Sequence, residues 1–172
     1  MSTTRITPDE SAVRAELRAW LTAHWQVDRS LVAWRELLVD SGWGMPHWPR
    51  EWHGRGLSVA LLPAIEAEFE AIGAVGVARI GIRLLAAATL LEHGTDDHKR
   101  RFLRRILTGE DTWCQLFSEP GSGSDLAGGT TRAAFDGTRW GVNGQKLWTT
   151  SAHHAHWGLL LARTDWDAPK HQ

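Results

Sequence analysis

The spacing of apolar residues changes part-way along the chain, and this change limits what the chain can fold into. Up to Gly109, apolar residues recur every three or four positions, which is the period of one face of an α-helix. Beyond Gly109, short runs such as TWCQLFS and TRWGVNG have the composition and alternation of β-strands. A block of helices followed by a block of strands predicts an α+β fold.

Helices are expected in five places before Gly109. The first carries a start signal, with Thr7 as N-cap, Pro8 at the first helical position and Glu10 placed to return a capping bond. The others are expected at 30–41, 58–73, 76–93 and 95–107, the last with Thr95 as its N-cap. Prolines and glycines rule out a regular helix at 42–58, whose tryptophans are expected to pack inward. The apolar stripe of the first helix comprises Val13, Leu17, Trp20, Leu21 and Trp25.

Four short strands are expected in the second part, within residues 112–118, 130–137, 138–144 and 156–164. Asp136-Gly137 lies between the second and third strands and is a strong hairpin signal. We expect the four strands to form one antiparallel sheet. Such a sheet needs further strands or a covering layer to hide its edges, so the sequence predicts an incomplete sheet.

Charge and composition argue against several classes of protein. The 172 residues include 19 Lys and Arg against 20 Asp and Glu, which is not the basic balance of a nucleic-acid-binding protein. The most apolar segments are too short or too polar to span a membrane, and the N-terminus has no signal-peptide pattern. The single cysteine, Cys114, excludes an internal disulfide and fits a reducing compartment. We therefore expect a cytoplasmic protein in which Cys114 is a buried strand residue.

The stretch CQLFSEPGSGSDLAGG, residues 114–129, is a candidate binding loop. It has no P-loop lysine, it has Leu126 where a dinucleotide fingerprint needs a third glycine, and neither Ser122 nor Ser124 has the flanking glycines of a hydrolase elbow. Consecutive small residues after a strand can still present several backbone N–H groups to a phosphate or a flavin. A solvated turn is the alternative, and composition alone leaves both interpretations open.

Two other charged or histidine-rich stretches carry no predicted site. His153, His154 and His156 could suggest metal ligation, but neighbouring strand residues face opposite sides, and no Cys or Glu pattern completes a zinc site. No metal is expected. The basic run HKRRFLRR, residues 98–105, is interpreted as the charged face of a helix.

Three motifs in a fixed order, FSEPGSGSDLA, NGQKLWTTSA and LLLARTD, resemble the acyl-CoA dehydrogenase family. Two upstream segments, GWGMPHWPREWHGRGLS and EHGTDDHKRRFLRRILTGEDTWCQLFSEPGSGSD, are also similar to family segments, so the resemblance covers essentially the whole chain. The first of these resembles the corresponding segment of a subgroup that includes enzymes for bulky acyl-CoA esters such as sterol side chains. The chain departs from the family at His53, where a glycine is usual, and at Arg104-Arg105, where prolines are frequent.

The resemblance implies a helical N-terminal domain over residues 1–110 and the first part of an antiparallel β-domain over residues 111–172. In the family, FAD lies between the β-domain and a C-terminal helical domain and takes up hydride from the acyl-CoA. Hydrogen-bond donors around the flavin ring suit this chemistry because they stabilise charge on the reduced ring. By position, the resemblance implies cofactor contacts at Gln115, Phe117, Ser118, Gly123, Ser124, Trp148, Thr149 and Thr150, with Ser124 also touching the substrate.

The resemblance also implies that part of the enzyme lies outside this chain. The family's catalytic base is a glutamate of the C-terminal helical domain, so no catalytic residue is assigned here, and Glu119 is assigned to the loop. The 172-residue chain alone is therefore expected to be incomplete and inactive. The expected partners are an acyl-CoA, an acceptor similar to electron-transfer flavoprotein, and other subunits in a homo- or hetero-oligomer. Two functions remain open: a truncated or partial FAD-dependent acyl-CoA dehydrogenase that desaturates an acyl-CoA thioester, and a non-catalytic truncated relative that binds an intact family member.

Overall fold

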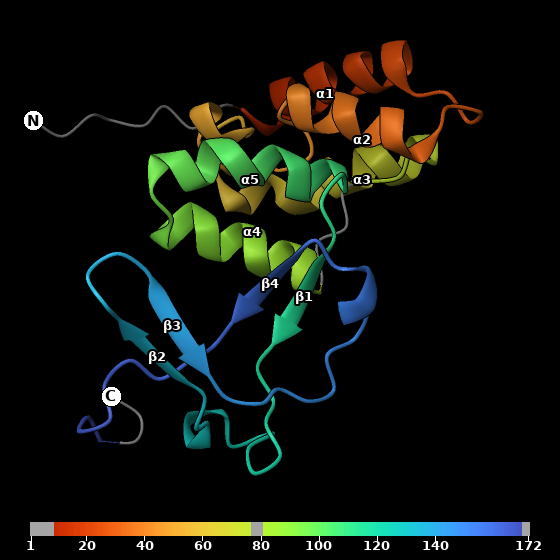
Figure 1. Cartoon of the computed structure of the whole chain (residues 1–172). Helices are drawn as coiled ribbons and strands as arrows, with labels where there is room; N and C mark the ends of the chain where they lie inside the picture. The colour runs from red at the N-terminus through yellow and green to blue at the C-terminus, as the bar shows by residue number, and fades with distance from the viewer. Residues whose placement is uncertain (1–8, 77–80, 170–172) are drawn as a thin grey trace, which may run out of the picture. The chain divides into compact units, whose positions relative to one another are not determined.

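The chain folds as two compact units, Met1–Glu110 and Asp111–Gln172. The structure, a computed structural model, describes residues 9–76 and 81–169. In these residues the first unit is helical and the second consists of short strands and loops (Figure 1). The predicted α+β class is therefore confirmed.

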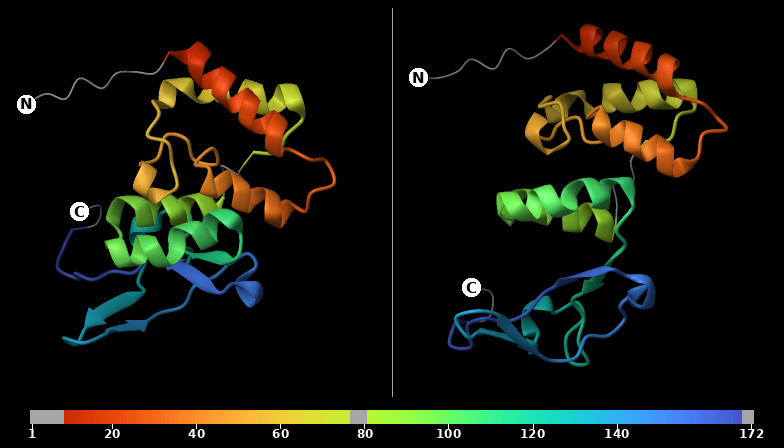
Figure 2. Two further views of the ribbon diagram at one scale, coloured as in Figure 1. Left: turned by 90° about the horizontal axis from the view of Figure 1, so that it is seen from above. Right: turned by 45° about the horizontal axis from the view of Figure 1, so that its top comes forward.

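The described part of the helical unit contains five α-helices: α1 (Glu10–His24), α2 (Leu31–Asp40), α3 (Leu62–Ile72), α4 (Ile82–His93) and α5 (Asp96–Thr108), with 3-10 turns at Arg50–Trp52 and Val59–Leu61. Helix α1 packs against α3, α2 against α5, and α4 against α5. Helices α4 and α5 lie side by side in both views of Figure 2. No helix within residues 9–76 and 81–169 is long and apolar enough to cross a membrane.

Several helix ends follow the local signals in the sequence. The Thr95 hydroxyl accepts a hydrogen bond from the backbone N–H of His98 (3.2 Å), so Thr95 is the N-cap of α5 as predicted. The Ser30 hydroxyl caps α2 in the same way. Gly73 ends α3 in the left-handed conformation (φ 70°), which glycine adopts without a steric penalty.

Two helix starts differ from the prediction. Helix α1 begins at Glu10 with Asp9 as its N-cap, because the Asp9 side chain accepts a hydrogen bond from the backbone N–H of Ser11. The predicted cap at Thr7 and Pro8 lies outside the described residues. Helix α4 begins at Ile82, later than the predicted start at Gly76. Residues 77–80 of that predicted helix also lie outside the described residues.

The helical unit has a large apolar core. Within the stripe predicted for α1, Val13, Leu17 and Leu21 are buried. The irregular segment 42–58 packs inward, as its tryptophans predicted: Trp43 and Trp48 are both buried. The largest fully buried side chains of the unit are those of Trp34, Trp43, Leu17, Leu21, Leu38, Met45, Ile65, Leu103, Ile106, Leu107, Glu68 and Val39.

Glu68 is a charged residue inside this core, and it joins α3 to α1. Its carboxylate accepts hydrogen bonds from Arg14 Nε (2.8 Å) and from Arg18 Nε and Nη2 (2.8 and 2.9 Å). The hydrogen bond from Arg18 outweighs the effect of burial and, with that from Arg14, holds the pKa of Glu68 below its ordinary value. The carboxylate therefore stays ionised and connects the two helices at neutral pH.

The residues that depart from the family pattern lie in different local settings. His53 has φ 64°, in the left-handed region that glycine occupies readily and other residues occupy at a cost. Arg104 donates two hydrogen bonds to the carboxylate of Asp40 (2.8 Å each), which connects α5 to α2. Arg105 pairs with Glu110 just beyond the end of α5.

The described part of the second unit, residues 111–169, contains four strands in two separate pairs. Strands β2 (Arg132–Phe135) and β3 (Trp140–Asn143) are antiparallel, and Gly137 has φ 98° in the turn between them. The predicted hairpin at Asp136-Gly137 is therefore confirmed. The prediction of one antiparallel sheet is wrong for the other pair, because β1 (Trp113–Leu116) and β4 (Trp157–Leu160) run parallel, with Trp113 opposite Trp157.

The parallel pairing follows from the path of the chain. After β1 the chain passes through the loop 119–129 and the whole β2–β3 hairpin before it returns as β4 (Figure 1). A long crossover of this kind allows the returning strand to run in the same direction as the first strand. The two pairs are joined by a bridge between Arg132 and Arg163.

Candidate functional site

The Gly/Ser loop after β1 is anchored at its base and open at its tip. The backbone N–H of Glu119 donates to the carbonyl of Ser122 (2.8 Å), and the N–H of Ser122 donates to the carbonyl of Glu119 (3.1 Å). The buried Ser122 hydroxyl donates to the carbonyl of Asp125. Gly123 and Ser124 are exposed, and a side chain added at Gly123 would meet no atom within 4 Å.

Glu119 anchors this loop through a set of hydrogen bonds. Its carboxylate accepts from the backbone N–H of Thr130 (2.6 Å), the hydroxyl of Thr130 (2.8 Å), the backbone N–H of Thr131 (2.9 Å) and Nζ of Lys146 (2.8 Å). Burial opposes ionisation, but these donors outweigh it and hold the pKa of Glu119 far below its ordinary value. Glu119 is therefore a permanent carboxylate at neutral pH and a poor proton acceptor.

Lys146 connects the loop to a second segment of the candidate site. Besides its ion pair with Glu119, its ammonium donates to the carbonyl of Phe117 (2.9 Å). The next residue, Leu147, donates its backbone N–H to the carbonyl of Ser118 (2.8 Å). The chain just before Trp148 therefore lies against the chain just after β1.

Trp148 has an unusual backbone conformation and an unusual exposure. Its φ is 57°, in the left-handed region that is unfavourable for a large side chain, and its side chain is 88% exposed. Ser151 also has a positive φ, of 61°. Strained residues held by surrounding structure are found most often at binding and catalytic sites. Core packing does not explain Trp148, because its ring is not in the core.

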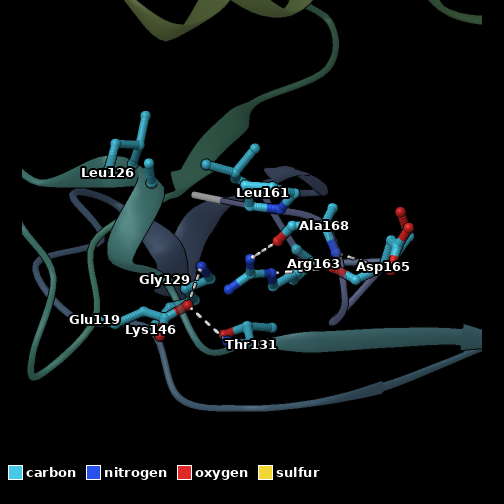
Figure 3. A pocket seen from close by; sticks show the side chains of 13 residues that line it. Glu119, Leu126, Gly129, Thr131, Lys146, Leu161, Arg163, Asp165 and Ala168 are labelled. Carbon is cyan, nitrogen blue, oxygen red and sulfur yellow. Dashed lines mark hydrogen bonds and ion pairs between the residues drawn. The ribbon is translucent and has the colours of Figure 1, made fainter. Parts of the chain in front are cut away.

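A pocket of about 270 Å³ lies behind the loop, and Figure 3 shows its lining. Glu119 and Lys146 lie at one end, and Asp165 and Ala168 lie at the other. Arg163 lies between them and donates to the carbonyls of Asp165 (3.0 Å) and Ala168 (2.7 Å). The pocket is lined by Glu119, Leu126, Ala127, Gly129, Thr131, Lys146, Leu161, Ala162, Arg163, Thr164, Asp165, Ala168 and Pro169.

The charged groups of this pocket already have partners inside the strand unit. Lys146 and Glu119 pair with each other, and the Arg163 guanidinium is bound by two carbonyls. The backbone of Arg163 also joins the two strand pairs, since its N–H donates to Thr131 and its carbonyl accepts from Ala133. The LLLARTD motif therefore contributes structural connections to this unit.

The predicted site residues fall into three groups along the chain, at 115–118, 123–124 and 148–150. The structure brings the first and the last of these groups together. Gln115, in β1, is exposed, and Phe117 and Ser118 are half-buried directly after that strand. The hydrogen bond from Leu147 to Ser118 places this group beside the last group, which comprises the exposed Trp148 and Thr150 and the half-buried Thr149.

The middle group lies at the tip of the loop. Gly123 and Ser124 are both exposed there. Ser124 lines a shallow hollow together with Asp125, Leu126, Ala127 and Leu161.

The anchor formed by Glu119, Lys146 and the Thr130-Thr131 backbone was not predicted from the sequence. The sequence assigns Glu119 to the loop without a partner, and it shows Lys146 only as part of the NGQKLWTTSA motif. The sequence did carry one signal for the anchor, because Glu119 and Lys146 are each a single charged residue next to an apolar segment. Their pairing could not be derived from spacing, since the two residues are far apart in the chain.

The histidine-rich stretch forms an exposed 3-10 turn, Ala152–His154, and the rings of His153 and His154 lie 4.0 Å apart. Nδ1 of His156 accepts a hydrogen bond from the backbone N–H of Thr112 (3.0 Å), so this ring is used to hold the start of β1. Within the described residues, no three His, Cys, Asp or Glu side chains are grouped closely enough to hold a metal ion.

Two known family models match the chain. Residues 7–110 match the family model for the acyl-CoA dehydrogenase N-terminal domain, and residues 114–172 match that for the acyl-CoA dehydrogenase middle domain. The chain belongs to the acyl-CoA dehydrogenase family. The resemblance identified from the three motifs is therefore confirmed, and the motifs lie in the middle-domain part of the match.

Individual relatives agree with this assignment. The chain is 49% identical over 137 residues to the acyl-CoA dehydrogenase FadE34 of Mycobacterium tuberculosis, covering 78% of this chain and 19% of the relative. It is 44% identical over 140 residues to the acyl-CoA dehydrogenase IpdE1 of the same organism, covering 81% of this chain and 36% of the relative. The chain thus spans well under half the length of the curated relatives that it matches here.

Solved structures show the same relationship. A structure titled as the steroid ACAD Tcur3481-Tcur3483 matches with a TM-score of 0.61 and 30% identity, over 94% of this chain and 45% of that chain. The ChsE4-ChsE5 complex from Mycobacterium tuberculosis matches with a TM-score of 0.60 and 31% identity, over 95% of this chain and 45% of that chain. Both matches cover the helical and strand units of this chain and less than half of the other protein.

Proposed function

We propose that this chain supplies the helical domain, residues 1–110, and the first part of the β-domain, residues 111–172, of an FAD-dependent acyl-CoA dehydrogenase. The reaction would convert the Cα–Cβ single bond of an acyl-CoA thioester into a double bond. FAD would accept the hydride from Cβ. The α-proton would go to a base outside these residues. Glu119, the buried carboxylate of the loop, would be a poor proton acceptor, because four hydrogen bonds to other groups lower its pKa.

The observation that carries this proposal is the position of Trp148. A large aromatic ring is 88% exposed on a left-handed backbone, beside the end of β1, in the segment that the resemblance assigns to flavin contact. A flat exposed ring with neighbouring hydroxyl groups fits a flat cofactor. The residues proposed to contact FAD are Gln115, Phe117, Ser118, Gly123, Ser124, Trp148, Thr149 and Thr150.

These residues would perform distinct tasks around the cofactor. The hydroxyl groups of Thr149 and Thr150 would donate hydrogen bonds to the flavin ring, and Ser124 at the loop tip would contact both FAD and the acyl-CoA. The anchor of Glu119 and Lys146 would keep the β1 end and the Trp148 segment at a fixed spacing, since Lys146 bonds to both Phe117 and Glu119. Binding groups held in place in advance lose less entropy when a ligand arrives.

The proposal includes partners and a location. The partners would be an acyl-CoA, an acceptor similar to electron-transfer flavoprotein, and further subunits. The name steroid ACAD of a structural relative at 30% identity supports a bulky, polycyclic acyl group as the substrate. The single cysteine supports a reducing compartment such as the cytoplasm.

Flavin titration tests the proposal. The purified chain is expected to quench FAD fluorescence, and Trp148→Ala is expected to weaken FAD binding by about tenfold or more, because aromatic stacking contributes on the order of 1–3 kcal/mol. Trp140→Ala is the matched control, since Trp140 is also exposed but lies on the β2–β3 hairpin.

A series of acyl-CoA thioesters with an artificial electron acceptor is then added to the FAD-loaded chain. The chain alone is expected not to reduce the acceptor, because the proposed base lies outside these residues. A folded chain that takes up no FAD would contradict the proposed FAD contacts of this chain. That result would favour the alternative of a non-catalytic interaction module.

A further inference from the structure

Two arginines of the helical unit converge on one point at the end of α5. A side-chain carbon built on Gly109 would lie 3.1 Å from Nη1 of Arg35 and 3.4 Å from Cζ and from Nη1 of Arg83. Arg35 belongs to α2 and Arg83 to the first turn of α4. Three helices therefore bring two guanidinium groups to the same place.

Among the residues that the structure describes, no acidic side chain pairs with either arginine. In residues 9–76 and 81–169, the structure records no ion pair and no hydrogen bond from the side chain of Arg35 or Arg83. Other arginines of the same helices do have partners: Arg104 pairs with Asp40, and Arg105 pairs with Glu110. The carboxylate of Glu110, the residue next to Gly109, is therefore already paired with Arg105.

The surroundings make the uncompensated charge costly. Both side chains are half-buried, and burial together with the charge of Arg35 lowers the pKa of Arg83. A guanidinium nevertheless stays charged throughout the physiological pH range. The carbonyl groups at the C-terminal end of α5 offset only about half a unit charge, which is less than the two positive charges present.

We propose that Arg35 and Arg83 form a binding site for a phosphate monoester. Guanidinium groups donate paired hydrogen bonds that match the oxygens of phosphate and carboxylate. A phosphate monoester carries a charge of about −1.5 to −2 near neutral pH and balances two guanidinium groups, whereas a carboxylate balances one. The charge of the pair therefore favours phosphate over carboxylate.

The phosphate has two possible sources. It can be free inorganic phosphate, or the terminal phosphate monoester on the ribose of a coenzyme A ligand. The second source rests on the proposed function, which assigns an acyl-CoA substrate. The first source is independent of it, so the site can be tested without FAD or catalysis.

Calorimetric titration of the folded chain with inorganic phosphate tests the site. The wild-type chain is expected to bind phosphate, and Arg35→Gln and Arg83→Gln are each expected to bind it at least about tenfold more weakly, as is usual when a hydrogen bond to a charged group is lost. Arg50→Gln is the control, because Arg50 is an exposed arginine of the same unit at the start of a 3-10 turn. Far-UV circular dichroism checks that each variant folds.

Coenzyme A and dephospho-coenzyme A identify the source. Tighter binding of coenzyme A than of dephospho-coenzyme A, lost in Arg83→Gln, would assign the site to the ligand's phosphate. If coenzyme A and dephospho-coenzyme A bind equally well and inorganic phosphate still binds, the site would be assigned to free phosphate. Absence of phosphate binding by the folded wild-type chain, or equal weakening by Arg50→Gln, would overturn the proposal. FAD binding measured on the same samples separates these results from a failure of the dehydrogenase proposal.

Discussion

Two tryptophans, one in each unit, lie in opposite environments. In the helical unit Trp34 is 1% exposed and packs against Trp20 and Trp25, whereas in the strand unit Trp148 is 88% exposed and sits on a strained backbone. Phe135 and Trp140 on the β2–β3 hairpin are exposed as well. The comparison indicates that the large fully buried side chains lie in the helical unit, whereas the strand unit exposes several large aromatic side chains.

Each unit also contains a buried glutamate, and the two glutamates have different structural roles. Glu68 joins two helices through Arg14 and Arg18, and Glu119 holds a loop through Lys146 and the backbone of residues 130 and 131. The pKa of each carboxyl is lowered, because hydrogen bonds from their partners outweigh burial. The same ionised group thus stabilises a core in one unit and fixes the geometry of a candidate site in the other.

The largest expected effect is on the helical core. Trp34→Ala should lower the free energy of unfolding by about 3–5 kcal/mol, because it empties a fully buried site and removes the hydrogen bond from Nε1 to the carbonyl of Val75. Trp140→Ala, the same change at an exposed position, should cost less than about 1 kcal/mol. Urea unfolding followed by far-UV circular dichroism gives both values. Equal losses for the two variants would contradict the division of roles.

The next effect concerns the anchor of the loop. Glu119→Gln should destabilise the strand unit by about 3 kcal/mol, because it leaves the largely buried ammonium of Lys146 without its counter-charge. The measurement is the rate of amide hydrogen exchange at Thr130 and Thr131, whose N–H groups donate to this carboxylate. Glu51→Gln, at an exposed position of the helical unit, is the control. Unchanged exchange at both threonines would remove Glu119 as the anchor.

A smaller effect is expected on changing the pH. Because the folded-state pKa of Glu68 lies below its ordinary value of about 4.5, its contribution to stability is present above that value and is lost as the pH falls toward the folded-state pKa. The denaturation midpoint should therefore fall as the pH is lowered below about 5. Glu68→Gln should show a flatter pH profile than the wild type. Parallel profiles for the two proteins would show that Glu68 does not contribute in this way.

The smallest effect on stability has the opposite sign. Trp148→Gly should raise the free energy of unfolding by up to about 1 kcal/mol, because glycine occupies the left-handed region without strain and the exposed ring buries little surface. The same variant should lose FAD binding. Trp140→Gly, in a regular strand, should be destabilised instead. A loss of stability in Trp148→Gly would show that the exposed ring is structural.

The sequence predicted best the features that depend on nearby residues. Helix α5 with its Thr95 cap, the end of α3 at Gly73 and the hairpin at Asp136-Gly137 all depend on contacts between neighbours in the chain. The parallel pairing of β1 with β4 was missed, because alternation shows which residues face one side of a strand but not which strand lies beside it.

In the candidate site, too, the sequence did not predict contacts between residues that are far apart in the chain. The motifs picked out the segments around Ser118 and Trp148, and the hydrogen bond from Leu147 to Ser118 brings these segments together. The partners of Glu119 lie 11, 12 and 27 positions along the chain, so the anchor becomes visible only once the chain is folded. The strain at Trp148 was likewise invisible, since it comes from the backbone and not from residue type.

Amide hydrogen exchange of the whole chain with and without FAD tests the central claim most directly. If the strand unit presents the flavin site and the helical unit supplies the core, FAD should slow exchange at residues 115–118 and 147–151 and leave the amides of α1 and α3 unchanged. Protection confined to α1 and α3, or no change at either strand segment, would contradict the account.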